Sequence, residues 1–189
     1  MPAVSNTSPL RYLIAAGNAD LLPELFDEIL VPPGVADELS HAAAPSIVRR
    51  WISSPPRWLR IHHLSSPPDP ELMEARDRGE REAIQLASEI TADVLIMDKW
   101  KGRAMAASRG LPVTGALGVL GSSYQKGLIE TPLRILADMR QQGFKISDEL
   151  AAKFEIPCGR GTRGECWPPT LRTVCDTLFS KCRSVCLTI

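Results

Sequence analysis

Four side chains that can supply oxygen ligands lie in separate segments: Asn6 and Asp98 each follow a predicted strand directly, Glu38 lies in the helix after the second strand, and Glu80 begins the helix that precedes the strand at 93–97. Ligands of parallel α/β sheets bind beyond the carboxyl ends of the strands, so the topology can bring these separate segments together. Carboxylates ~4–8 Å apart repel one another unless a cation lies among them. Mg²⁺ or Mn²⁺ prefers such oxygen ligands. The set therefore predicts a divalent-metal site that can activate water and stabilise the leaving oxygen in phosphodiester hydrolysis.

Each of these side chains also has a purely structural interpretation. Asp98 could cap the helix that follows its strand, and Asn6 could close an Asx turn. Glu38 could be a solvated helix residue, and Glu80 near a helix start gains from the helix dipole without any catalytic role. Each residue alone is weak evidence, whereas the four together form a pattern.

The elements that must position these side chains alternate between short apolar runs and helical periods. Strands are predicted at 3–5, 28–31, 58–62, 93–97 and 112–114, and helices over 19–26, 34–41, 46–52, 101–109, 116–125 and 132–142. The run DVLIM at 93–97 is typical of a strand buried on both faces. Strands that alternate with helices imply right-handed crossovers. The predicted fold class is therefore α/β, with three layers and a mostly parallel central sheet flanked by helices.

Two helix boundaries are predicted from local signals. Ser8 could cap the first helix, with Pro9 at its first position, where a missing N–H costs nothing. The longest helical stretch, 71–90, is expected to be interrupted around Gly79.

The charge balance excludes a protein that coats nucleic acid by charge alone. The chain has 189 residues, with 22 Lys+Arg against 22 Asp+Glu and a formal net charge of zero. No run approaches the ~18 apolar residues of a transmembrane helix. The start lacks the basic and apolar regions of a signal peptide. We therefore expect a cytoplasmic protein with no membrane contact.

The cysteines indicate that two compositions have been joined. All five lie after residue 157, without a CxxC pair or a histidine beside them, so a zinc ribbon is a poor match. Residues 1–156 carry 17 basic and 20 acidic side chains, whereas 157–189 carry 5 and 2. We expect a domain over 1–152 and a poorly ordered, Cys-containing extension over 153–189.

Several segments, in the same order, resemble the VapC-like toxin subfamily of PIN-domain proteins. They are VSNTSPLRYLI at 4–14, LLPELFDEILVPPGVADEL at 21–39, the stretch from RGEREAI to QKGLI at 78–129, and GFKISDEL at 143–150. The resemblance implies a Mg²⁺- or Mn²⁺-dependent endoribonuclease, the toxin of a toxin–antitoxin pair, that hydrolyses RNA phosphodiesters. It also implies a cognate antitoxin protein as partner and a homodimer.

Carried over to this sequence, the resemblance implies that the metal ligands are Asn6, Glu38, Glu80 and Asp98, the three acids being catalytic. In GEREAI, alignment on the DVLIMD strand without gaps selects Glu80 over Glu82, which lies ~200° around a regular helix from it. The choice between these two glutamates stays open on the sequence.

Three further residues have roles by the same resemblance. Ser8 corresponds to a small hydroxyl residue that supports the metal site by hydrogen bonding. Lys101 and Arg103 follow the Asp98 strand and either contact RNA phosphate or lie on a solvated helix face.

The departure from an all-acidic site is Asn6, because an amide oxygen can ligate Mg²⁺ but brings no charge and binds more weakly. An alternative is therefore a degenerate PIN domain that binds RNA or a protein without cleavage. A phosphatase or response-regulator-like domain is disfavoured, because it needs a nucleophilic Asp at the position of Asn6, and an asparagine cannot form an aspartyl-phosphate. Dinucleotide binding is disfavoured because no G-x-G-x-x-G follows a strand.

Overall fold

Five parallel strands form the central sheet of the computed structural model, which describes residues 1–67, 69–74 and 77–146. The strands are β1 (Pro2–Ser5), β2 (Glu28–Val31), β3 (Leu59–Ile61), β4 (Val94–Ile96) and β5 (Val113–Thr114). Their order is β3-β2-β1-β4-β5, and every neighbouring pair is parallel. The chain progresses outward from β1 to β3 and then restarts at β4 on the other side of β1. This reversal creates a topological switch point between β1 and β4, where α/β sheets place ligand sites.

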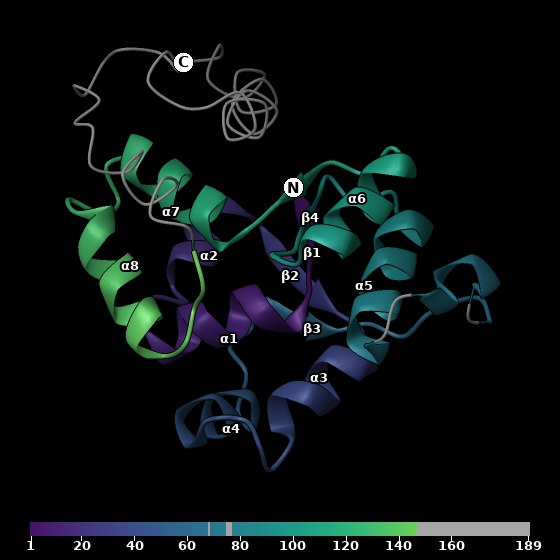
Figure 1. Cartoon of the computed structure of the whole chain (residues 1–189), viewed down its shortest axis with the longest axis horizontal. Coiled ribbons are helices and arrows are strands. Elements are labelled where there is room, and N and C mark those ends of the chain that lie inside the picture. The colour runs from purple at the N-terminus through teal and green to yellow at the C-terminus, as the bar shows by residue number, and fades with distance from the viewer. Residues whose placement is uncertain (68, 75–76, 147–189) are drawn as a thin grey trace.

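Helices flank the sheet and make its parallel connections. They are α1 (Thr7–Ala15), α2 (Leu21–Leu25), α3 (Pro33–Ser40), α4 (Ser46–Ile52), α5 (Arg78–Glu89), α6 (Trp100–Ser108), α7 (Ala116–Gln125) and α8 (Pro132–Gln141), with a 3₁₀ turn, η1, at Pro70–Glu74. In Figure 1, α7 and α8 lie on one side of the sheet and α5 and α6 on the other, with α3 and α4 below. The expected α/β class with a helix-flanked sheet is confirmed.

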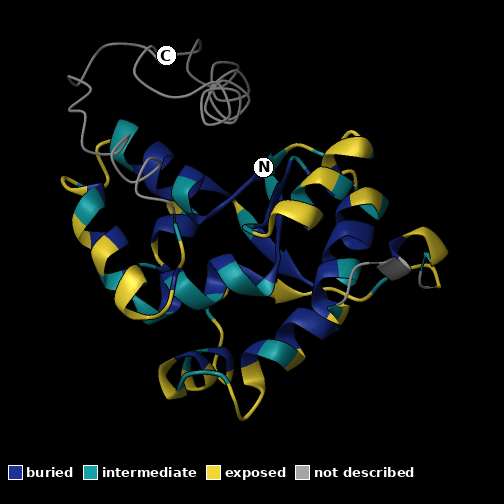
Figure 2. Cartoon of the chain, in the orientation of Figure 1, coloured by how far each residue is buried: buried dark blue, intermediate teal, exposed yellow. Residues whose placement is uncertain are grey.

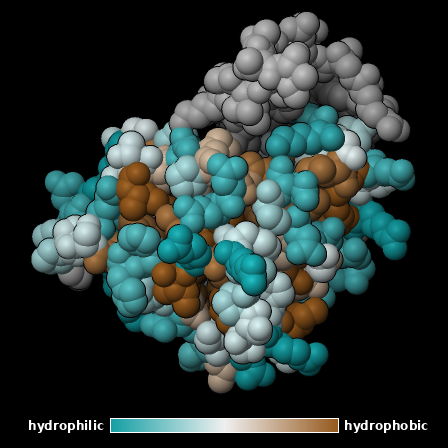
Figure 3. Space-filling view, turned by 180° about the vertical axis from the view of Figure 1, so that it is seen from behind, coloured by the Kyte–Doolittle hydropathy of each residue, from teal (hydrophilic) through white to brown (hydrophobic). Residues whose placement is uncertain are grey.

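The core is built on the strands, because their apolar side chains are covered on both faces. Ala3, Val4, Leu95 and Ile96 are fully buried, and Figure 2 shows most of the central strands β1 and β4 in the colour of buried residues. On the face seen in Figure 3, apolar residues form separate patches among hydrophilic ones. Within the described residues, no helix combines the length and apolar character needed to cross a bilayer.

One of the two predicted helix boundaries is wrong. The cap of α1 is Asn6, whose Oδ1 accepts a hydrogen bond from the Thr7 N–H at 2.7 Å, so Ser8 lies inside the helix. The interruption expected around Gly79 is found just before it, because the 3₁₀ turn η1 ends at Glu74 and α5 begins at Arg78. Gly79 itself lies in the first turn of α5 and permits a close approach: a Cβ there would lie 2.7 Å from Oε1 of Glu38. The predicted extension over 153–189 lies outside the described residues.

Candidate active site

Asn6 and Asp98 leave the sheet side by side at its carboxyl end. The register pairs Ser5 of β1 with Ile96 of β4, and the Asn6 N–H donates to the Ile96 carbonyl at 2.9 Å. Asn6 is only 3% exposed. The switch point thus sets the positions of both residues, although 92 positions of sequence separate them.

Asp98 has one satisfied and one unsatisfied carboxylate oxygen. Its Oδ1 accepts a hydrogen bond from the Ala116 N–H at 2.8 Å, at the start of α7. Its Oδ2 is buried and has no hydrogen-bond partner. Burial raises the pKa of Asp98 to about 6, while the Ala116 N–H and the nearby Arg103 guanidinium oppose that rise. An unpaired buried acceptor is costly in a folded protein. The free oxygen is therefore a candidate ligand atom.

Asp98 does not cap α6, the helix that follows it in the sequence. The cap position of α6 is Lys99, without a side-chain cap bond. The predicted capping role is thus wrong for α6, and the carboxylate instead reaches the first residue of α7.

Glu38 joins three helices through its carboxylate. The residue lies on α3, its Oε2 accepts a hydrogen bond from the Thr7 hydroxyl on α1, and its Oε1 accepts one from the Gly79 N–H of α5 at 3.0 Å. The hydroxyl that supports the acidic cluster is therefore that of Thr7. Ser8, the residue expected from the sequence, is half-buried next to it. Thr7 is a functional candidate that sequence reasoning missed, although it adjoins Asn6 in the SNTSPL segment.

Glu80 is an almost fully buried carboxylate, with its side chain 7% exposed. It is the third residue of α5. Burial raises its pKa, and repulsion from the Glu38 carboxylate raises it further. Lys99 Nζ lies 3.5 Å from Oε2 of Glu80 and also pairs with Asp77. Because the Glu38 carboxylate is close enough to repel that of Glu80, the structure brings two of the expected acids near each other.

Glu82 points to a different place. Its Oε2 accepts a hydrogen bond from the Gly34 N–H of α3 at 2.7 Å, and its Oε1 pairs with Arg78 Nε at 2.6 Å. Arg78 in turn reaches Asp37 at 2.8 Å. Helix α3 begins after Pro32, which provides no side-chain cap. Glu82 therefore caps α3 from the neighbouring helix.

A glycine lies against each of the three acids. A Cβ at Gly102 would lie 2.6 Å from Oε1 of Glu80, and one at Gly115 would lie 2.7 Å from Oδ1 of Asp98. Gly79 occupies the same position relative to Glu38. The backbone can approach the carboxylates only because these positions lack side chains. Sequence reasoning missed all three, although each lies within a few residues of a motif it singled out.

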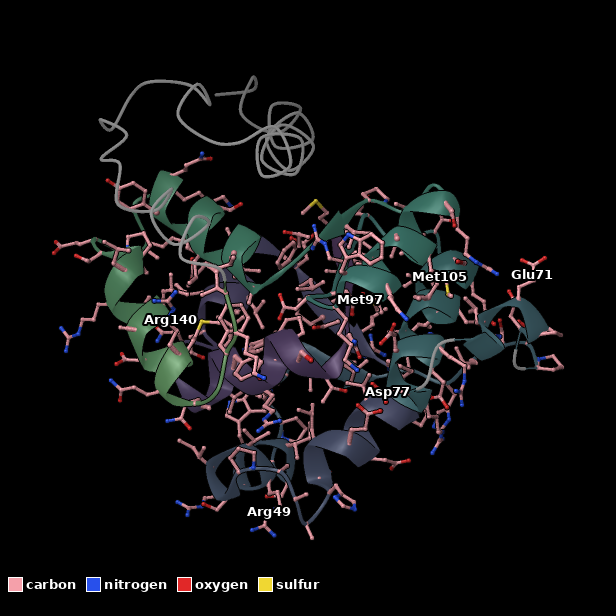
Figure 4. All side chains as sticks on the ribbon, in the orientation of Figure 1. Arg49, Glu71, Asp77, Met97, Met105 and Arg140 are labelled. Carbon is pink, nitrogen blue, oxygen red and sulfur yellow. The ribbon has the colours of Figure 1, made fainter. Side chains whose placement is uncertain are left out.

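The two basic candidates differ in environment. Lys101 on α6 is exposed. Arg103 is half-buried beside Asp98, and its Nη1 donates to the Met97 carbonyl at 2.9 Å. Figure 4 labels Met97, which directly precedes Asp98, and Asp77, which precedes α5.

A cleft of about 350 Å³ opens next to Glu38. Its lining comes from α1, α3 and the segment after α3: Thr7, Arg11, Asp37, Glu38, Leu39, His41, Ala43 and Ala44. Nε of Arg11 is buried and has no hydrogen-bond partner.

The donor types fit a hard divalent cation, although the described residues hold no ready-made cluster of three His, Cys, Asp or Glu ligands. Both oxygens of Glu38 are engaged by Thr7 and Gly79, so a cation would compete with those hydrogen bonds. The unpaired Oδ2 of Asp98 and the mutual repulsion of Glu38 and Glu80 are features that a cation would relieve.

A family model, DUF3368, described as a PIN domain, matches residues 2–155. No curated protein and no solved structure matches the chain. PIN domains are generally nucleases, so the match supports a nuclease-type hydrolase. The matched residues make up most of the chain and include Asn6, Glu38, Glu80 and Asp98, and the chain belongs to the PIN-domain family.

Proposed function

We propose that this protein is a Mg²⁺- or Mn²⁺-dependent endoribonuclease whose site is formed by Asn6, Glu38, Glu80 and Asp98. The observation that carries the proposal is the Asp98 carboxylate, which keeps one buried oxygen unpaired at the switch point of the sheet. A buried carboxylate with a strongly perturbed pKa in this position is a functional-site signature.

The same four residues would hold the metal. When bound, the metal supplies water activation and neutralises charge on the phosphodiester oxygens. Cation binding and deprotonation are coupled, so an ion would bind more tightly once Asp98 and Glu80 have lost their protons. Asn6 adds an oxygen without a charge, so metal affinity is expected to be lower than with an aspartate there.

The other residues orient the acids and the substrate. Thr7 and the Gly79 N–H fix the Glu38 carboxylate between α1 and α5. Arg103 and Lys101 lie on the side of Asp98 that continues into α6 and would neutralise RNA phosphates there. The cleft beside Glu38 provides space for the polynucleotide next to the acids. Water is excluded from the Asp98 and Glu80 side chains by their burial, which strengthens their electrostatic interactions.

The biological role that we propose is the toxin of a toxin–antitoxin pair, acting as a homodimer controlled by a cognate antitoxin protein. The support is the order of the SNTSPL, VADEL, GEREAI and LIMDKWKGR segments. Co-purification of the tagged protein with a small protein that suppresses its cleavage would test this role.

A second candidate is an RNA-binding domain without cleavage, and Asn6 favours it. Its amide oxygen already accepts the Thr7 N–H and carries no charge. This alternative predicts RNA binding that is unaffected by metal and by Asp98→Asn.

RNA cleavage by the purified full chain separates the two functions. It is measured with Mn²⁺, with EDTA and in the Asp98→Asn variant. Asp20→Asn is the matched control, because Asp20 is exposed and forms no side-chain cap bond. Metal-dependent cleavage that disappears only in Asp98→Asn supports the nuclease. Cleavage that persists in Asp98→Asn refutes the proposed site. Activity that appears only after Asn6→Asp indicates a disarmed enzyme.

A further inference from the structure

We propose that Trp100 is a stacking platform for a nucleobase of single-stranded RNA next to the acidic site. This inference rests on the proposed function, because it assigns a contact to its substrate. Trp100 is the first residue of α6 and follows Asp98 by two positions.

Trp100 is 78% exposed and does not contribute to the packing of the fold. The other large hydrophobic side chains exposed in the described part of the chain are aliphatic and no more than half exposed: Ile47, Ile61 and Leu128. The tryptophans at 51 and 58 instead pack against the core and against each other, with ring centroids 5.6 Å apart. Trp100 belongs to neither the core nor its partly buried margin.

Side-chain contacts on either side of Trp100 connect the start of α6 to neighbouring segments. Lys99 pairs with Asp77 and lies 3.5 Å from Glu80, which connects the start of α6 to α5. Arg103, one helical turn further on, donates to the Met97 carbonyl. A tryptophan ring loses little conformational entropy when it stacks, because only two side-chain torsions are free.

The charges around the site explain why an uncharged contact is useful there. Glu38, Glu80 and Asp98 repel RNA phosphates, and Lys99 is already engaged by acidic partners. Lys101, which is exposed on the same helical turn as Trp100, could pair with an RNA phosphate. Base stacking tolerates any sequence, because every base has a π-face, and it requires an unpaired base. The combination selects single-stranded RNA over a duplex.

The test measures binding of a short labelled single-stranded oligoribonucleotide by fluorescence anisotropy. The full chain is used in EDTA, so that binding is read without cleavage. The variants are Trp100→Ala, Trp100→Phe and, as the matched control, Ile61→Ala, which removes a half-exposed apolar side chain from β3. We expect Trp100→Ala to raise the Kd about tenfold, the loss typical of removing one aromatic platform. Trp100→Phe should retain most of the affinity, and Ile61→Ala should behave as wild type.

Two results would overturn the inference: an unchanged Kd in Trp100→Ala, or a loss in Trp100→Phe as large as in Trp100→Ala. Metal-dependent cleavage by the wild-type protein is measured in parallel. Cleavage with an unchanged Kd in Trp100→Ala refutes the stacking role alone. Binding that depends on Trp100 without any cleavage refutes the nuclease and supports the platform. Absence of both binding and cleavage refutes both.

Discussion

Glu80 and Glu82 lie two positions apart on α5, and their substitution should have opposite effects on stability and activity. Glu80 is buried and is repelled by the Glu38 carboxylate, whereas Glu82 accepts the Gly34 N–H and pairs with Arg78. Neutralising Glu80 removes a buried, repelled charge. Truncating Glu82 leaves a backbone N–H of α3 without its partner. Comparing the two variants therefore distinguishes a carboxylate that we propose to act in the metal site from one that stabilises the fold.

The expected cost of Glu82→Ala follows from its contacts. A hydrogen bond to a charged group contributes about 1.5–3 kcal/mol. The ion pair with the 56% exposed Arg78 adds only ~0.3–0.5 kcal/mol because solvent screens it. We expect Glu82→Ala to lower the free energy of unfolding by ~2–3 kcal/mol and Glu82→Gln, which keeps an acceptor, by about 1 kcal/mol.

Glu80→Gln should leave the free energy of unfolding at neutral pH unchanged or raise it. The pKa of Glu80 is higher in the folded protein than in the unfolded chain, so its ionised form opposes folding above that pKa. The weak contact with Lys99 at 3.5 Å does not outweigh this effect. Cleavage should be abolished, because a site acid has been lost.

Urea denaturation followed by tryptophan fluorescence gives the free energies, and RNA cleavage with Mn²⁺ gives the activity per folded molecule. At urea concentrations below its unfolding midpoint, the Glu82→Ala variant should still cleave RNA measurably. The reasoning is refuted if Glu82→Ala abolishes cleavage at unchanged stability, or if Glu80→Gln cleaves as well as the wild type.

Three further predictions concern the other acids and the metal. The pKa of Asp98 is about 6 instead of its usual 3.8, so its contribution to stability is present below about pH 4 and is lost as the pH rises through 6. Asp98→Asn should therefore be more stable than wild type at pH 7.5, by up to ~3 kcal/mol, with no difference at pH 3.5; equal stability at both pH values in urea titrations would contradict this. Gly79→Ala should displace the Glu38 carboxylate and reduce cleavage strongly, while the gain of ~1 kcal/mol in helix propensity offsets much of the lost hydrogen bond; full activity of the variant would show that Glu38 need not stay where it is. Mn²⁺ should raise the Tm of the wild type and not that of Asp98→Asn, because ligands that bind only the folded state stabilise it; an equal rise in both proteins in differential scanning fluorimetry would place the ion elsewhere.

Local sequence patterns were sufficient for most of the elements. The strand at Glu28–Val31 and the helices at Ser46–Ile52 and Ala116–Gln125 have the predicted bounds, because apolar periodicity and flanking proline or glycine act over a few residues. Local patterns could not reveal the role of a residue that serves a distant partner. Gly79 permits the close approach of the Glu38 carboxylate, which lies 41 positions away in the sequence.

By itself, the sequence determined the fold class, the PIN-type motifs and a list of candidate oxygen ligands, since these depend on local composition and order. Only the tertiary structure decided how those ligands are held. The pairing of β1 with β4 brings Asn6 and Asp98 to one edge of the sheet. The packing of α3 on α5 brings Glu80 close enough to Glu38 for repulsion, while Glu82 bonds to the Gly34 N–H at the start of α3. Burial, which raises the pKa of Asp98 and leaves its Oδ2 unpaired, arises only when segments distant in sequence exclude water together.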